Sequence, residues 1–144
     1  MSILLTVLIG TLGGVSVGLQ GPIAAQIGKR VGSAASSFVV HVSGALLSGA
    51  LLLARGGEDI QNWRSLSWYM LGSGFFGVLL YLTINHTMPR LGATTALALI
   101  IIGQLAMGVL IDHFGLFGVA VRQLDLWRAA GLVLLLAGGY LVVR

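Results

Sequence analysis

Long apolar runs dominate this chain, and short polar breaks separate them. Five runs stand out, at about residues 3–20 with an extension towards 28, 33–53, 67–85, 93–114 and 126–143. Each is close to the roughly 20 residues that an α-helix needs to cross about 30 Å of hydrocarbon. A backbone in lipid must satisfy its own hydrogen bonds, and these runs are too long for barrel strands. The pattern therefore predicts five transmembrane helices.

The composition indicates the same surroundings. Of the 144 residues, 57% are hydrophobic and 8% are charged, whereas a soluble domain usually carries about 25% charged residues. This small number of charges cannot cover a water-facing surface. Lipid must therefore surround most of the chain. The start, MSILLTVLIG, lacks the positive region of a signal peptide, and we interpret it as the first helix. We expect one all-α integral membrane domain over residues 1–144.

The basic residues divide evenly between the two sides of the predicted bundle. If loops alternate sides, the side of the N-terminus, called side A, receives Arg55, Arg64, Arg122 and Arg128. The opposite side, side B, receives Lys29, Arg30, Arg90 and Arg144. An asymmetry of Lys and Arg normally orients a membrane protein, and this chain has none. Either a weaker cue sets one orientation, or the chain inserts both ways and pairs antiparallel.

The first run combines a glycine stripe with a proline. Gly10, Gly14 and Gly18 recur at every fourth residue, and such a stripe lets another helix approach closely. Pro22 lacks a backbone N–H, and its ring crowds the carbonyl of Gly18, so we expect a kink or break there. Interrupted helices can line a binding cavity, which would place Gln20 in one. The alternative is a plain helix end with Gln20 at the membrane interface.

Polar side chains inside the other runs are the main candidates for a binding site. His41 lies near the middle of its run, where an ionisable residue is costly and suggests function; the alternative is a neutral histidine bonded to a neighbouring helix. Gln104 is also mid-span and needs a partner, either a helix or a ligand. Tyr81 and Asn85 share a face with Gly77 and offer an aromatic plane and an amide, although core packing alone would explain Tyr81.

Other kinds of chemistry find little support. Asp112 lies at the side A end of run 93–114, where a carboxylate is usually capped or paired with an arginine. We find no pattern for nucleotide binding, metal ligation or a catalytic triad, and the chain has no cysteine. We therefore expect no enzyme activity, no cofactor, no metal and no nucleic acid partner.

Several stretches of the chain are characteristic of one protein family. The most specific is the run GQLAMGVLIDHFGLFGV at residues 103–119. Weaker ones are LQGPIAAQIGKRVGSA at 19–34, HVSGALL at 41–47 and PRLGATTALALIIIGQ at 89–104. They resemble the small five-helix YdcZ-like branch of the drug/metabolite transporter superfamily, and the resemblance extends over nearly the whole chain.

The resemblance implies half of a ten-helix transporter, because larger members of the superfamily hold two inverted five-helix halves. The chain would then pair with itself, or with a sibling chain, in the bacterial inner membrane. The related four-helix multidrug transporters use a glutamate in their first helix, and run 3–20 has no acidic residue, which speaks against the same proton-coupled mechanism.

We expect a transporter of a small metabolite or drug-like molecule that works as an antiparallel homodimer with alternating access. The residues predicted to line its midplane cavity are Gln20, His41, Tyr81, Asn85 and Gln104, with His41 as the candidate for proton coupling. The alternative is a non-transporting membrane subunit that stabilises a larger complex. Such a subunit would need small-residue stripes but no converging polar groups inside the membrane.

Overall fold

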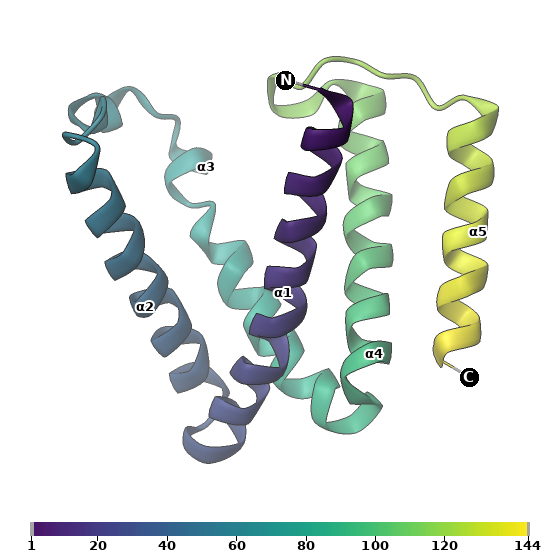
Figure 1. The fold of residues 1–144 in the computed structure, drawn as a ribbon, viewed down its shortest axis with the longest axis horizontal. Coiled ribbons are helices and arrows are strands. Elements are labelled where there is room, and N and C mark those ends of the chain that lie inside the picture. The colour runs from purple at the N-terminus through teal and green to yellow at the C-terminus, as the bar shows by residue number, and fades with distance from the viewer. Residues whose placement is uncertain (1, 144) are drawn as a thin grey trace. The chain divides into compact units, whose positions relative to one another are not determined.

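The computed structural model describes residues 2–143, and the regular elements in this range are all helical (Figure 1). They are α1 (Ile3–Val31), α2 (Ser33–Ala54), the short 3₁₀ helix η1 (Ile60–Ser65), α3 (Trp68–Leu71), α4 (Gly74–Phe114), a second 3₁₀ helix η2 (Leu116–Gly118) and α5 (Leu126–Val143). The chain forms two compact units, unit 1 (residues 1–89) and unit 2 (residues 90–144). The all-α fold class predicted from the sequence is confirmed.

Four helical stretches in residues 2–143 are long and apolar enough to cross a membrane. They are Ile3–Val31, Ser33–Ala54, Trp68–Phe114 and Leu126–Val143. The third has 47 residues, which corresponds to about 70 Å of helix and is more than twice the hydrocarbon thickness of about 30 Å. Its backbone is non-helical at Gly92, with φ 80° and ψ 166°, in a region that favours glycine. Gly92 therefore divides α4 into a first part (residues 74–91) and a second part (residues 93–114).

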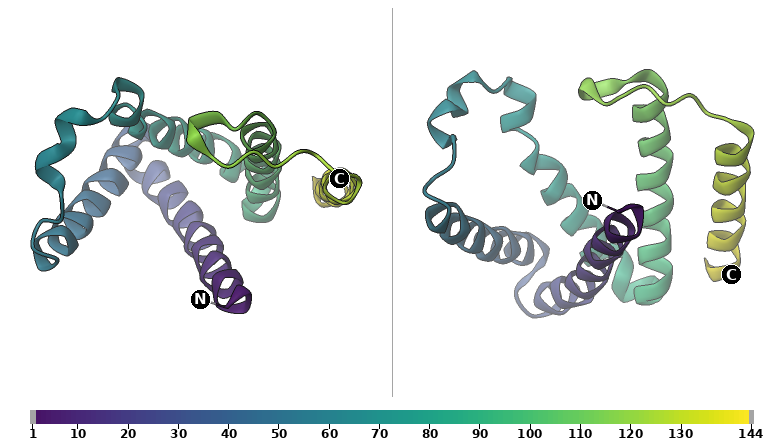
Figure 2. Two further views of the ribbon diagram at one scale, coloured as in Figure 1. Left: turned by 90° about the horizontal axis from the view of Figure 1, so that it is seen from above. Right: turned by 45° about the horizontal axis from the view of Figure 1, so that its top comes forward.

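In unit 1, α1 and α2 form a hairpin that turns at Gly32. This residue has φ 94°, and its N–H donates to the carbonyl of Gly28 at 2.9 Å. Lys29 and Arg30 lie in the last turn of α1, where cations interact favourably with the helix dipole. Figures 1 and 2 show the two helices meeting at this turn and diverging away from it. The buried residues of α1 and α2 accordingly lie near the turn.

The break expected between Gly18 and Pro22 does not occur. Helix α1 is a single helix from Ile3 to Val31, with Pro22 inside it. Proline removes one backbone hydrogen bond, but tertiary packing can hold a helix together across it. That packing starts directly at the proline, because Gly21, Ala24 and Ala25 are the buried residues of α1.

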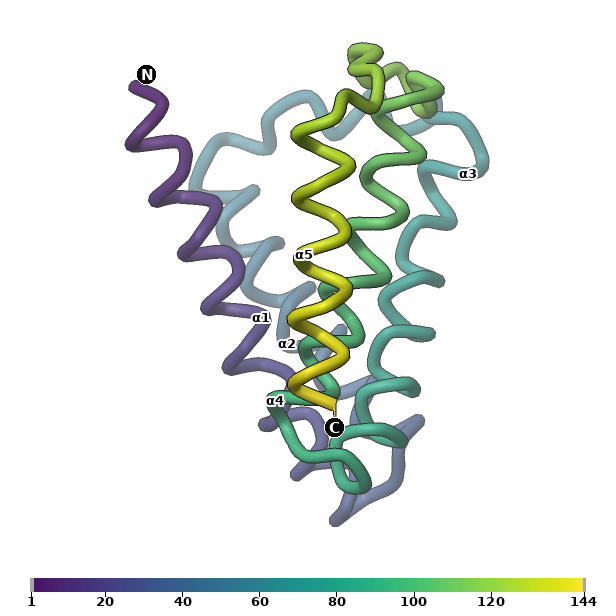
Figure 3. The backbone as a smooth tube through the Cα atoms, turned by 90° about the vertical axis from the view of Figure 1, so that its right-hand side faces the viewer, coloured from purple at the N-terminus to yellow at the C-terminus, as the bar shows by residue number. Residues whose placement is uncertain are grey.

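In unit 2, the second part of α4 and α5 form another hairpin, which is visible in Figure 3. At one end, the Thr95 hydroxyl lies 3.4 Å from the carbonyl of Val142. At the other end, the N–H of Arg122 donates to the carbonyl of Asp112 at 2.8 Å. The carboxylate of Asp125 accepts the N–H of Arg128 at 2.8 Å, which caps the start of α5. Both ends of the hairpin are thus held by hydrogen bonds.

Both units expose most of their large apolar side chains. Leu46 of α2 is 71% exposed and Trp127 of α5 is 85% exposed, although a water-soluble protein buries such residues. The buried set is small and concentrated in unit 1. This distribution fits a chain whose outer surface meets lipid rather than water.

Candidate functional site

A polar cluster lies inside unit 1, between α2 and the first part of α4. The His41 ring of α2 packs edge-on against the Tyr81 ring of α4, with centroids 5.4 Å apart and planes at 84°. Tyr81 is buried, as is Ser37 one turn before His41. The structure therefore brings together two of the candidates predicted from the sequence, His41 and Tyr81.

The hydrogen bonds of His41 fix its neutral tautomer. Its Nδ1 lies 2.7 Å from the carbonyl oxygen of Ser37, and a carbonyl can only accept, so Nδ1 carries the proton. Nε2 then holds the lone pair and faces α4 at Gly77, where an added Cβ would lie 2.7 Å from it. Gly77 thus leaves just enough room for the imidazole, and Nε2 is the atom that could accept a proton.

Asn85 lies at a second close contact between helices, where α4 meets α1. Its Nδ2 donates to the carbonyl of Tyr81 at 2.8 Å, and its side chain lies against Gly28 of α1. Asn85 is 8% exposed, and its Oδ1 is buried without a hydrogen-bond partner among residues 2–143. An unpaired buried acceptor costs about 1–3 kcal/mol, and here Oδ1 is the atom that packs against Gly28.

The α1–α2 contact next to Asn85 is also polar. The hydroxyl of Ser36 donates to the carbonyl of Ala24 at 2.7 Å, and both residues are fully buried. This bond ties the two helices of the hairpin through a small residue on each side. The cluster of unit 1 therefore lies where α1, α2 and the first part of α4 contact one another.

Gln20 takes no part in this cluster. It is exposed on α1, whereas Asn85, predicted to line the same cavity, lies against Gly28, eight residues further along the helix. The stripe of Gly10, Gly14 and Gly18 is also open, because a Cβ at each of them would meet nothing within 4 Å. Within residues 2–143, the glycine stripe that the sequence singled out therefore has open space at each of its three positions.

Gln104 belongs to unit 2, where it lines a groove of about 350 Å³ between the second part of α4 and α5. Gly108 and Asp112 line the same groove from α4, and Arg128 and Gly131 line it from α5. The volume falls in the range of about 300–1,000 Å³ that small-molecule pockets occupy. Gln104 makes no hydrogen bond within residues 2–143 and is exposed to this groove.

Asp112 forms the ion pair that a boundary carboxylate suggested. The Nη1 atom of Arg128 lies 3.3 Å from Oδ2 of Asp112. Both side chains are about one third exposed, at 33% for Arg128 and 34% for Asp112. The pair links α5 to α4 while remaining accessible from the groove.

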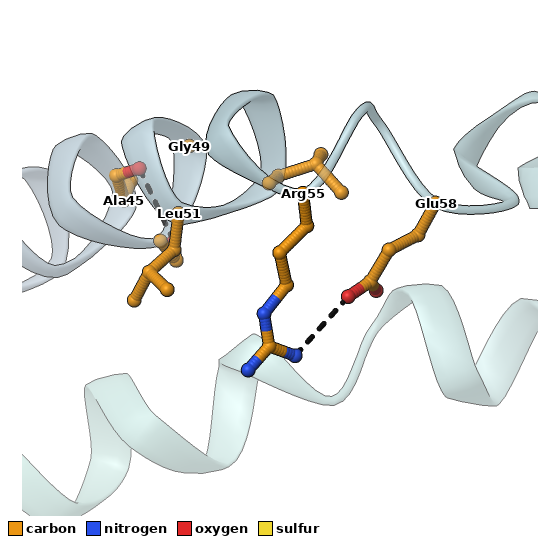
Figure 4. Close-up of a pocket in the computed structure, with 7 residues that line it drawn as sticks. Ala45, Gly49, Leu51, Arg55 and Glu58 are labelled. Atoms are coloured by element: carbon orange, nitrogen blue, oxygen red, sulfur yellow. Dashed lines mark hydrogen bonds and ion pairs between the residues drawn. The ribbon is translucent and has the colours of Figure 1, made fainter.

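Another groove, of about 510 Å³, runs along the end of α2 in unit 1 (Figure 4). Arg55 and Glu58 close it with an ion pair of 3.3 Å, but these side chains are 68% and 55% exposed. Ion pairs this exposed contribute little to stability. Its remaining lining is mostly small or aliphatic, as at Ala45, Gly49 and Leu51, so this groove offers fewer specific contacts than the one at Gln104.

Sequence reasoning missed the residues that make room for the polar side chains. Gly28 was not considered as a contact for Asn85, and Ser36 was not considered as a link between α1 and α2. One signal was present: Gly21, Ala24, Ala25 and Gly28 continue small residues beyond Pro22. A break at Pro22 would have ended the helix before this second small-residue face, so the sequence did not predict a contact there.

Comparison with known proteins identifies a family. The profile of the family described as "Putative inner membrane exporter, YdcZ" matches residues 5–141. No curated protein and no solved structure matches the chain. The matched range includes the polar cluster of unit 1 and the groove of unit 2.

Proposed function

This chain belongs to the YdcZ family, described as inner-membrane exporters, and from that membership we propose that it exports a small metabolite or drug-like molecule as an antiparallel homodimer. It is a multi-pass protein of the inner membrane. Two copies with opposite orientations would together supply ten helices and enclose the substrate near the midplane. Alternating access would follow from exchange of two equivalent conformations between the copies.

The observation that carries the homodimer is the open glycine stripe of α1. Gly10, Gly14 and Gly18 have no neighbour within 4 Å of a built Cβ, although such stripes in membranes usually receive another helix. A second copy can provide that helix, with the glycine stripe of its α1 packed against the glycine stripe of the first copy. The even division of basic residues supports opposite orientations, since no excess of Lys or Arg on one side selects a single orientation.

The proposed cavity uses the polar groups described above. Asn85 would offer its unpaired Oδ1, Gln104 and Gln20 their amides, and Tyr81 an aromatic face. His41 would supply a hydrogen bond or carry a proton at Nε2. A non-transporting subunit would have no need for such groups within the membrane, and their presence favours transport.

Cysteine crosslinking tests the antiparallel pair, and the chain contains no cysteine of its own. If α1 crosses its partner antiparallel near Gly14, Gly14→Cys should form a disulfide with itself. Gly10→Cys should link to Gly18→Cys on a differently tagged copy, and neither should link well to its own kind. Disulfides need Cα atoms within about 7 Å, and four residues of helix span about 6 Å, so the pattern resolves the register. Oxidation in native membranes followed by gel electrophoresis measures it.

Leu12→Cys is the matched control, because Leu12 lies on the opposite face of α1 and is 65% exposed. It should crosslink weakly. Self-links at residues 10 and 18 without the mixed product would mean a parallel pair and end the proposal. Equal crosslinking of residues 12 and 14 would show that the stripe is no interface.

The proton-carrying role of His41 can be tested by substitution. His41→Gln keeps a hydrogen-bonding side chain at this position but has no nitrogen that can accept a proton. If His41 carries the proton during transport, proton movement across the membrane of proteoliposomes should stop in His41→Gln. A pH-sensitive dye enclosed in the vesicles measures this movement. Unchanged proton movement in His41→Gln would end the coupling role.

A further inference from the structure

The groove of unit 2 presents one positive and one negative charge to a ligand. Arg128 and Asp112 meet through a single contact of 3.3 Å, from Nη1 to Oδ2. A guanidinium has five N–H donors and a carboxylate has two acceptor oxygens, so most of this capacity is unused within the pair. Since each side chain is about one third exposed, the unused donors and acceptors are accessible to a molecule in the groove.

An apolar groove adjoins this polar one. It has a volume of about 270 Å³ and also lies between the second part of α4 and α5. The two grooves share four lining residues, Leu105, Val109, Leu132 and Leu135. The groove with the charged pair is therefore lined by aliphatic side chains as well, and these also line its neighbour.

We propose that this surface binds a zwitterion that carries an ammonium and a carboxylate or phosphate on an apolar body. The ammonium lies at Asp112, the anion lies at Arg128, and the apolar body lies along the shared leucines and Val109. The proposal rests on the proposed function, because it names the substrate class of the exporter.

A ligand with both charges fits this pair better than a ligand with one. When a zwitterion separates Asp112 from Arg128, each protein charge exchanges one opposite partner for another. A ligand with only an ammonium or only a carboxylate leaves one of the two protein charges without a partner. Each protein charge is about one third exposed, so water offsets part of this loss, but the contact with an opposite charge is still lost. The groove therefore discriminates between ligands by their charge pattern.

Two sources supply this chemistry, a free zwitterionic metabolite and the headgroup of a zwitterionic lipid. The probe for the first is leucine, because its side chain suits an aliphatic groove. Two analogues each remove one charge: 3-methylbutylamine lacks the carboxylate, and 4-methylpentanoate lacks the ammonium. The probe for the second is phosphatidylethanolamine, which carries an ammonium and a phosphate.

Equilibrium binding of labelled leucine to the full chain in phosphatidylglycerol vesicles tests the proposal. Leucine should compete with the label at least about tenfold better than either analogue. Asp112→Asn and Arg128→Gln should each weaken leucine binding about tenfold or more. Glu58→Gln is the matched control: it breaks the ion pair with Arg55 in unit 1 and should leave binding unchanged.

The outcomes distinguish the two sources of the zwitterion, and they also distinguish ligand binding from a purely structural role of the Asp112–Arg128 pair. If leucine does not bind but phosphatidylethanolamine is retained by the wild type and lost from both variants, the zwitterion is the lipid headgroup. If Asp112→Asn and Arg128→Gln lower thermal stability but leave both ligands bound, the ion pair only joins α4 to α5 and the proposal is wrong. Equal competition by leucine and its analogues also overturns it. This binding requires neither a gradient nor a dimer. A negative binding result therefore does not contradict the proposed export, and a parallel crosslinking pattern does not contradict the proposed binding in this groove.

Discussion

Gly28→Ala should lower the free energy of unfolding by about 1–3 kcal/mol, a cost typical of adding a methyl group to a packed contact. A Cβ at Gly28 would collide with the side chain of Asn85. Asn85 cannot move away freely, because it is buried and its Nδ2 is bonded to the carbonyl of Tyr81. The α1–α4 contact of unit 1 must therefore open. Unfolding of the detergent-solubilised protein by a denaturing detergent measures the change.

The control for this prediction is Gly13→Ala in the same helix. A Cβ there meets nothing within 4 Å, and alanine is favoured over glycine inside a helix by about 1 kcal/mol. The two substitutions should therefore change stability in opposite directions. In an Asn85→Ala background the cost of Gly28→Ala should largely disappear, since the colliding atoms are gone. An equal cost in both backgrounds would show that the Gly28–Asn85 contact is not what the methyl group disturbs.

The second large effect is expected at Gly77→Ala, again at about 1–3 kcal/mol. Its Cβ would lie 2.7 Å from Nε2 of His41, and the ring is held from the other side by the bond from Nδ1 to the Ser37 carbonyl. Either that bond breaks or α2 and α4 separate. Loss of the edge-on contact with Tyr81 should accompany the destabilisation and would appear as a change in the tyrosine ring resonances.

The comparison for Gly77 is Gly44→Ala in α2, where the new methyl group has open space. This variant should be neutral or slightly stabilised. In a His41→Ala background, Gly77→Ala should cost little, because the ring it would strike is absent. Full stability of Gly77→Ala in the wild-type background would mean that His41 does not pack against α4 as described.

The helices were predictable because lipid imposes a simple rule on the chain. A run of about 20 apolar residues must form a helix to satisfy its backbone, and α2 and α5 follow the predicted runs to within one residue. The end of the first helix was less predictable, because the local effect of Pro22 opposes the packing of Gly21, Ala24 and Ala25, and sequence alone does not give the strength of that packing.

For the polar cluster of unit 1, the sequence indicated which polar residues to expect but not which residues they would contact. Polarity within an apolar run singled out His41 and Asn85. Their neighbours Gly77 and Gly28 matter because they have no side chain and so leave room for the polar groups. A periodic pattern reveals which residues share a helix face; it does not reveal which two faces meet. For the same reason, the sequence placed Asn85 and Gln20 in one predicted cavity, whereas in the structure Asn85 lies against Gly28.

The non-helical backbone at Gly92 bears on how many times the chain crosses the membrane. With the helix divided there, residues 68–114 are long enough for two crossings, and five crossings in all would place the two chain ends on opposite sides. Were α4 continuous through residue 92, the same stretch would count as one crossing, and both ends would emerge on the same side. Arg122 and Arg128 would then leave the side of Arg55 and Arg64. The equal division of basic residues that the sequence predicts therefore depends on a glycine that carries no charge.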